Sequence, residues 1–215
     1  MTSRMDIIDG AQASGRKYGL IYTKKCGWID LGHANPESAL GLWNQIINEK
    51  DSSAALEGYF RVTYKQLMGR PYFKVGITKR YDIKKGLSIA DKKSIALSIF
   101  MDVSHSFETL QSDWPFKKFT NSGYSAEDLV SNLIGFYRAV EPSGQHIQLC
   151  EPVNKRIALE IWDKYGAVGD MKNYTTVPYV YPFSPAVGGP MSAELPYALT
   201  TIKPAKEGIY YREAK

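Results

Sequence analysis

The highest density of reactive side chains lies in residues 22–34, which contain Cys26, Asp30 and His33. A thiol, a carboxylate and an imidazole are the groups that nucleophilic and acid–base catalysis use most. A β-prone run at residues 18–23 comes before them, and a helix is expected to begin near residue 36. The sequence therefore predicts its first candidate site in this segment.

Cys26 is a candidate nucleophile of the papain-like kind. In a turn between a strand and a helix, helix amides and the adjacent Lys24 and Lys25 would favour the reactive thiolate. A cysteine amidase or peptidase also needs a histidine, for which His146, in a possible strand at 145–150, and His33 are available. The competing interpretation is a buried cysteine that packs as a small hydrophobic residue.

A second pattern places an acid and a histidine three residues apart, at Asp30 and His33 and again at His105 and Glu108. On helices each pair would share one face, so two packed segments could present four metal ligands. This spacing is also common on solvated helix faces. We therefore predict neither a metal nor a cofactor.

Glu108 is a candidate general acid. It follows an apolar helical run and precedes Trp114 and Phe116, so aromatic cover is expected to keep its carboxyl protonated near neutrality. Glycosidases use such an acid together with a second carboxylate, which Asp30 or Glu127 could supply. The alternative interpretation is a solvated glutamate on a helix surface.

Composition limits the classes of function. The 215 residues, 44% of them hydrophobic, suffice for one domain with a substantial core. The net charge of +5 suits a polyanion, but the lysines are scattered in pairs, so we predict no nucleic-acid partner. No apolar run is long enough for stable membrane insertion. The first ten residues do not resemble a cleaved signal peptide, so we expect a protein that is cytoplasmic before export and acts after secretion or in the periplasm.

The periodicity predicts an α+β fold, a mostly helical single domain over residues 1–173. Apolar residues at helical spacing and capping residues, with Ser125 and Asp91 as N-caps, indicate helices at about 36–49, 92–111, 125–140 and 155–165. Alternation around a turn indicates a β-hairpin at 58–83. Six of the eleven prolines fall within 178–204, so residues 174–215 are expected to form an extended Pro/Tyr-rich arm on the domain that could add an edge strand.

Three segments resemble a family of uncharacterised bacterial proteins, many of which look like exported envelope proteins. They are Gly27-Trp-Ile-Asp-Leu-Gly-His33, Phe107-Glu-Thr109 and Tyr124-Ser-Ala-Glu-Asp-Leu-Val-Ser-Asn-Leu-Ile-Gly135. The resemblance implies that the family pattern includes Gly27, Asp30, His33, Glu108, Glu127, Asp128 and Asn132, and that it omits Cys26 and His105. It names no reaction. It favours Asp30, His33 and Glu108 as the catalytic residues.

A shorter likeness concerns lysozyme-like lytic enzymes. The helix that ends at Glu108 and the later Asn132-Leu-Ile-Gly-Phe-Tyr137 are similar to their glutamate and asparagine helices, although the spacing is short and a Gly-Leu-Met-Gln element is missing. We therefore expect a cell-envelope hydrolase, with peptidoglycan as its polymer, Glu108 as general acid, and Asp30 with His33 orienting water or substrate. The alternatives are the cysteine amidase and a non-catalytic protein-binding module.

The expected partners follow from this setting. They are a cell-wall polymer or peptide as substrate and, for an antibacterial effector or toxin, an immunity or delivery protein.

Overall fold

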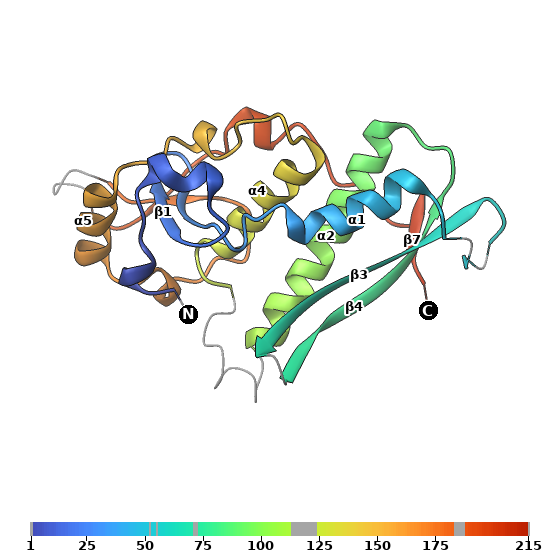
Figure 1. Ribbon diagram of the computed structural model, residues 1–215, viewed down its shortest axis with the longest axis horizontal. Helices are drawn as coiled ribbons and strands as arrows, with labels where there is room; N and C mark the ends of the chain where they lie inside the picture. Colours follow the sequence, from blue (N-terminus) through green and yellow to red (C-terminus); the bar gives the residue numbers. More distant parts are fainter. Residues whose placement is uncertain are drawn as a thin grey trace.

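The computed structural model describes residues 2–51, 53–54, 56–70, 73–112, 124–182 and 188–214. Over this part of the chain the protein is a single α+β domain in which helices outweigh strands, as the sequence predicted. Figure 1 shows an elongated molecule, with α5 (Lys155–Tyr165) and β1 (Leu20–Thr23) toward one end and the ribbon of β3 (Tyr59–Arg70) and β4 (Phe73–Lys84) toward the other. Helix α4 lies between them, and the two termini lie at opposite ends. None of the described helices combines the length and the apolar character that a membrane crossing requires.

The four predicted long helices are present. They are α1, Glu37–Asn48; α2, Ile89–Ser112; α4, Asp128–Val140; and α5, Lys155–Tyr165. Two predicted caps are wrong. Helix α2 begins earlier than expected, where the Ser88 hydroxyl accepts the Asp91 N–H at 3.1 Å. Helix α4 begins three residues late, because the Asp128 carboxylate accepts the Ser125 N–H at 2.7 Å and holds Ser125 in a turn before the helix.

The predicted hairpin is β3, Tyr59–Arg70, paired antiparallel with β4, Phe73–Lys84, in a register that sets Tyr59 opposite Lys84. One face packs against α1 and α2. This face is formed by alternating buried side chains, which include Phe60, Val62, Tyr64, Tyr81 and Ile83. The strand period of two therefore turns one apolar side of the ribbon to the helices.

A second hairpin was not predicted. Strand β1, Leu20–Thr23, pairs antiparallel with β2, Gly27–Asp30. Gly27 has a φ of +66°, and a Cβ there would lie 2.0 Å from the Tyr179 carbonyl oxygen, so the turn requires glycine. Cys26 therefore lies in a turn between two strands, and the expected position at a helix start is wrong.

Two clusters of buried apolar side chains hold the molecule together. The larger lies among α1, α2, α4 and the β3–β4 ribbon, and the smaller lies among β1, β2, α5 and the segment around Tyr181. Helix α4 is the central element, because all of its residues except Arg138 are buried. The residues just before it, Ser125 to Glu127, reach toward the smaller cluster, where Ala126 is packed.

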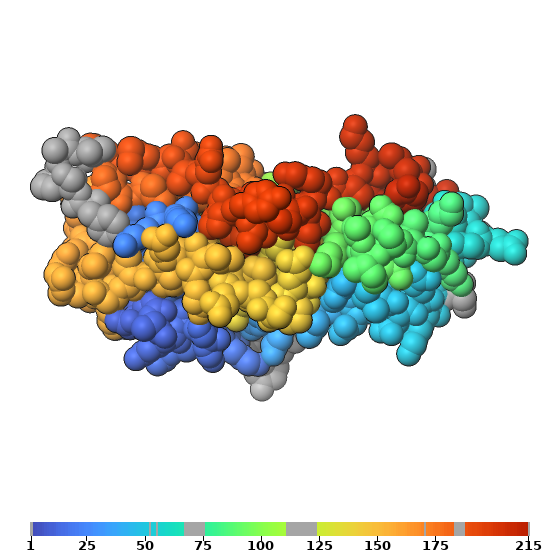
Figure 2. Space-filling view, turned by 90° about the horizontal axis from the view of Figure 1, so that it is seen from above, coloured from blue at the N-terminus to red at the C-terminus, as the bar shows by residue number. Residues whose placement is uncertain are grey.

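The C-terminal arm contacts both ends of the molecule. The Tyr22 hydroxyl accepts the Tyr181 N–H at 2.6 Å, and the Tyr137 hydroxyl accepts the Ile202 N–H at 2.9 Å. Strand β7, Tyr211–Glu213, then adds a third antiparallel strand beside β4. Figure 2 shows the C-terminal arm, coloured orange to red, running along one side of the molecule.

Candidate functional site

The acid pocket is a cavity of about 240 Å³ between the N-terminal residues, the end of β2 and the start of α4. Its lining consists of Thr2, Asp6, Tyr18, Gly19, Asp30, His33, Ser125, Glu127 and Asp128. The Tyr18 side chain is exposed, and the His33 side chain is one-third exposed, so the pocket opens to solvent. The structure thus brings two of the predicted site residues, Asp30 and His33, into one cavity with three further acids, Asp6, Glu127 and Asp128.

Asp30 has a structural role in addition to its place in the pocket. One carboxylate oxygen accepts the N–H groups of Gly32, at 2.6 Å, and His33, at 3.4 Å, which forms an Asx turn after β2. The Asp30 N–H donates to the Ser131 hydroxyl of α4 at 3.0 Å. These bonds fix the end of β2 against α4 and hold the turn that carries His33.

His33 faces the start of α4. Its Nε2 lies 3.8 Å from Asp128 Oδ1, whose side chain is only 6% exposed. The backbone behind His33 packs tightly on α4, since a Cβ at Gly135 would lie 2.8 Å from the His33 carbonyl oxygen. The expectation that Asp30 and His33 share a helix face is wrong, because Asp30 ends a strand and His33 lies in a turn. The two side chains still reach the same cavity.

Glu127 and Asp128 are the buried acids of the pocket. Burial raises the pKa of Glu127, and the Asp30 charge raises it further, although hydrogen bonding and His33 oppose the rise. Burial also raises the pKa of Asp128 well above its usual range, and the charges of Glu127, Glu108 and Asp30 add to this effect. Each therefore tends to keep a proton at a pH where an exposed carboxyl has lost its own.

The contacts of Glu127 leave one oxygen available. Oε1 accepts the Thr2 hydroxyl at 3.2 Å, whereas Oε2 is buried without a hydrogen-bond partner among the described residues. An unpaired buried carboxyl oxygen costs free energy, so a proton, a water molecule or a ligand would stabilise it. Carboxylates at the first residues of a helix often serve only to oppose its positive dipole end, but the side chains of Glu127 and Asp128 also line a cavity.

Glu108 lies behind this pocket. It is fully buried on α2, where Oε2 accepts the Tyr124 N–H at 3.0 Å and Oε1 has no partner within the described parts of the chain. The interpretation of Glu108 as a solvated surface residue is therefore wrong. Phe107 is buried beside it, while Trp114 and Phe116, expected as aromatic cover, lie outside the described residues. Glu108 does not line the acid pocket, but its charge is felt by Asp128.

A family model described as "Protein of unknown function (DUF4056)" matches residues 3–150. The chain belongs to this family. The match includes every residue of the acid pocket except Thr2, and it includes Glu108. No curated protein and no solved structure is similar enough to count as a match. The resemblance to an uncharacterised family is thus confirmed, while the individual motifs and the lysozyme likeness stay predictions.

The two cysteines of this DUF4056 chain form a buried pair of free thiols. The hydrogen bond with Cys26, and then burial, raise the pKa of the Cys150 thiol. The segment predicted as a strand at 145–150 is instead a turn followed by a short 3-10 helix, Gln148–Cys150, and His146 Nε2 lies 3.0 Å from the Glu141 carbonyl oxygen. Burial is typical of structural cysteines and removes the exposure that a nucleophile needs, although the Lys25 charge opposes the rise in the pKa of Cys150.

The four-ligand metal arrangement does not form. His105 packs against the Tyr124 ring, with a centroid distance of 6.1 Å, while Glu108 turns into the interior. Within the ranges that the structure describes, no three His, Cys, Asp or Glu side chains are arranged to hold a metal ion.

Sequence reasoning missed several residues of the pocket in the DUF4056 domain. Thr2 and Asp6 come from a lead-in without periodicity, and Tyr18 begins the β-prone run at 18–23, so no local pattern marked them as site residues. The adjacent acids Glu127 and Asp128 did carry a signal. They come directly before a strongly apolar helix, where a carboxyl must be either exposed or buried at a cost.

Proposed function

We propose that this DUF4056 protein is an acid–base hydrolase of a cell-envelope polymer, with peptidoglycan as the substrate and the acid pocket as its active site. The proposal is based mainly on the environment of Glu127. Its buried carboxyl has a raised pKa and one oxygen without a hydrogen-bond partner in the described parts of the chain, and it lines a solvent-open cavity together with Asp30 and His33. Groups whose pKa values are shifted in this way are concentrated at catalytic sites.

Cleavage of a glycosidic bond requires a carboxyl that protonates the leaving oxygen and a base that takes a proton from water. Glu127 is the general acid in this proposal, because it reaches the cavity and its environment favours the protonated form. Asp30 and His33 orient the attacking water and accept its proton. The sugar bond to the leaving oxygen breaks as the bond to the water oxygen forms.

Glu108 takes a different role from the one expected from the sequence. A general acid must come within hydrogen-bond reach of the leaving oxygen, and Glu108 has no exposed surface. Its charge instead raises the pKa of Asp128. We therefore treat Glu108 as a positioning residue that helps to keep Asp128 protonated.

Two observations outside the acid pocket support peptidoglycan as the substrate. The net charge of +5 favours approach to an anionic cell-wall polymer. The resemblance to exported envelope proteins agrees with this setting. Secretion as an antibacterial effector, with an immunity or delivery partner, belongs to the same proposal.

The test is digestion of purified peptidoglycan, with the products identified by mass spectrometry. The wild type is expected to release glycan fragments, and Glu127→Gln to slow their release by about 10²–10⁴, the usual contribution of a general acid. Glu57→Gln changes an exposed glutamate and should leave the rate unchanged. Because the pKa of Glu127 is raised, activity should fall as the pH rises through that pKa.

Three results would contradict parts of this proposal. Unchanged digestion by a folded Glu127→Gln variant would remove Glu127 from the mechanism. Cleaved peptide stems that depend on Cys26 would favour an amidase. Absence of product from the wild type would overturn the hydrolase and favour a protein-binding module.

A further inference from the structure

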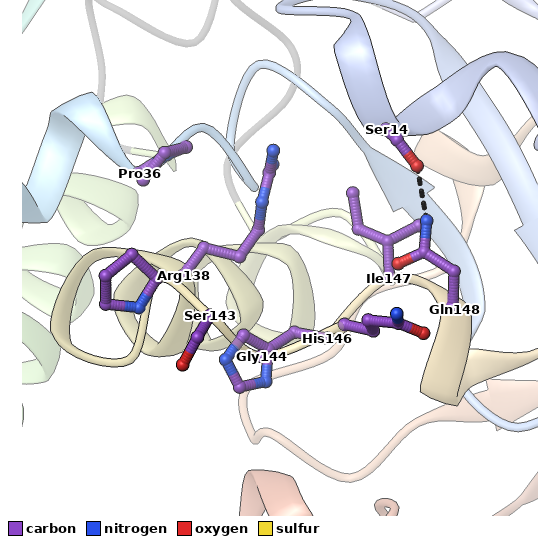
Figure 3. A pocket seen from close by; sticks show the side chains of 10 residues that line it. Ser14, Pro36, Arg138, Ser143, Gly144, His146, Ile147 and Gln148 are labelled. Carbon is purple, nitrogen blue, oxygen red and sulfur yellow. Dashed lines mark hydrogen bonds between the residues drawn. The ribbon is translucent and has the colours of Figure 1, made fainter.

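A second and larger cavity, the Arg138 pocket, lies beside the acid pocket. It has a volume of about 550 Å³, and its lining includes Ser14, Pro36, Arg138, Ser143, His146 and Gln148 (Figure 3). The turn at residues 33–36 separates the two cavities, since His33 lines one and Pro36 the other. A polymer bound in the acid pocket could therefore extend into the Arg138 pocket.

The charge of the Arg138 pocket comes from a single guanidinium. Arg138 is half-buried, and burial lowers its pKa. One of its nitrogens donates to the Ala34 carbonyl oxygen at 2.6 Å. In the described part of the chain no carboxylate forms an ion pair with Arg138, and no Asp or Glu lines the cavity. A guanidinium has five N–H donors in a planar fork, so most of them remain for an anion.

The remaining polar groups of the pocket are neutral. Ser14 and Gln148 are hydrogen-bonded to each other on one wall, and Ser143 and Gln145 lie at the turn after α4. Figure 3 shows the Arg138 side chain between Pro36 and Ile147. Hydroxyls and amides around one cation suit a ligand with an anionic group and several hydroxyl or amide groups.

His146 supplies a second, independent observation. The ring is 3% exposed, and its Nε2 carries the proton because the Glu141 carbonyl can only accept. Nδ1 is buried and has no partner among the residues described. A buried polar atom without a partner is rare and costly, and in the wall of a cavity a ligand can supply the missing bond.

We propose that the Arg138 pocket is a subsite for a sugar that carries a carboxylate, with the Arg138 guanidinium binding the carboxylate through two parallel hydrogen bonds. That the ligand is a saccharide rests on the proposed function. The preference for an anion follows from the pocket alone. The Arg138 guanidinium forms no ion pair among the described residues, and the described lining contains no acid. The neutral side chains then bind the hydroxyl and amide groups of the same sugar.

Isothermal titration of the full chain with two monosaccharides tests this inference. N-acetylmuramic acid and N-acetylglucosamine share a ring and an acetamide but differ by a lactyl carboxylate, and neither contains a bond between sugars that could be cleaved. The wild type is expected to bind the acid about tenfold or more tightly, as charge-assisted hydrogen bonds imply. Arg138→Gln should abolish this difference, whereas Arg156→Gln, at an exposed arginine of α5, should preserve it.

Ser143→Asp provides a variant at an exposed position that does not depend on removing Arg138. The added negative charge should weaken binding of the acid by a larger factor than binding of the neutral sugar, so the preference for the acid should shrink. Equal affinities for the two sugars, or a preference that survives Arg138→Gln, would overturn the inference. Failure of peptidoglycan digestion with the preference intact would overturn the proposed function alone.

Discussion

At the scale of single residues, the distinctive feature is a group of acids that the fold keeps out of water. Glu108, Glu127 and Asp128 are each at most 5% exposed, and Asp30 lies beside the latter two. Loss of hydration and repulsion between the charged forms favour the protonated forms of Glu127 and Asp128. Such an arrangement reduces the stability of the folded state and is retained where chemistry requires it.

The raised pKa values of the buried carboxyls make the stability of the folded protein depend on pH. A carboxyl whose pKa is raised on folding holds a proton that the unfolded chain releases, so stability falls as pH rises from about 4 toward the raised pKa. Asp128→Asn should remove the main part of this loss. We expect its Tm to exceed that of the wild type at pH 8, by about 2–4 °C for each kcal/mol relieved, and to converge with it near pH 4.

Calorimetry over pH 4–9 measures this difference. Asp163→Asn is the control, because the Arg4 hydrogen bond lowers the pKa of that exposed carboxyl. We expect Asp163→Asn to lower the Tm slightly at neutral pH, which is opposite in sign to the increase expected for Asp128→Asn. A Tm difference for Asp128→Asn that does not change with pH would contradict the burial argument.

At the scale of elements, α4 and the turn at residues 33–36 form the framework of both pockets. Gly135 allows the turn to approach the helix, because a Cβ there would lie 2.8 Å from the His33 carbonyl oxygen and 3.1 Å from the Ala34 carbonyl carbon. Arg138, one helical turn later, donates to the Ala34 carbonyl oxygen. The position of His33 in the acid pocket therefore depends on close packing against α4.

Two helical glycines allow a matched test. Gly135→Ala is expected to lower the free energy of unfolding by about 1–3 kcal/mol, the usual cost of overpacking, and to displace His33 and reduce hydrolysis. A Cβ at Gly41, in α1, would have no atom within 4 Å, so Gly41→Ala should raise the free energy of unfolding by up to about 1 kcal/mol. Urea unfolding measures both changes. Equal effects of the two variants would show that the turn is not held by this contact.

At the scale of the whole molecule, the C-terminal arm links the two apolar clusters. Tyr181 packs in the smaller cluster, and Tyr211 in β7 packs in the larger one against Tyr81, with ring centroids 6.1 Å apart. Helix α4 packs in the larger cluster, and Ala126, just before the helix, packs in the smaller one. We therefore expect the clusters to unfold together.

Adjacent tyrosines of the arm test this coupling. Tyr211→Ala is expected to lower the free energy of unfolding by about 2–5 kcal/mol, as for other buried aromatic residues, whereas the partly exposed Tyr210 should tolerate alanine. Circular dichroism and the fluorescence of a Trp43→Phe background should report one shared transition, since Trp28 and Trp162 lie in the smaller cluster whereas Trp43 packs against the larger one. A fluorescence transition unaffected by Tyr211→Ala would show that the clusters unfold separately.

The sequence by itself determined the elements with strong local periodicity. Helices α1, α2, α4 and α5 and the β3–β4 ribbon follow from apolar spacing, because an element with one apolar face must bury it. The β1–β2 hairpin was missed, since its second strand has only four residues, Gly27–Asp30, and its turn depends on contact with the arm at Tyr179.

Only the tertiary structure decided the composition of the site. Asp30 and His33 meet Glu127 and Asp128, almost one hundred positions later in the chain, because β2 and the following turn pack on α4. Other contacts between distant segments bury Glu108 and set Cys26 beside Cys150. Local patterns identify which residues can do chemistry, whereas burial and proximity, which set protonation and access, arise from contacts between distant segments.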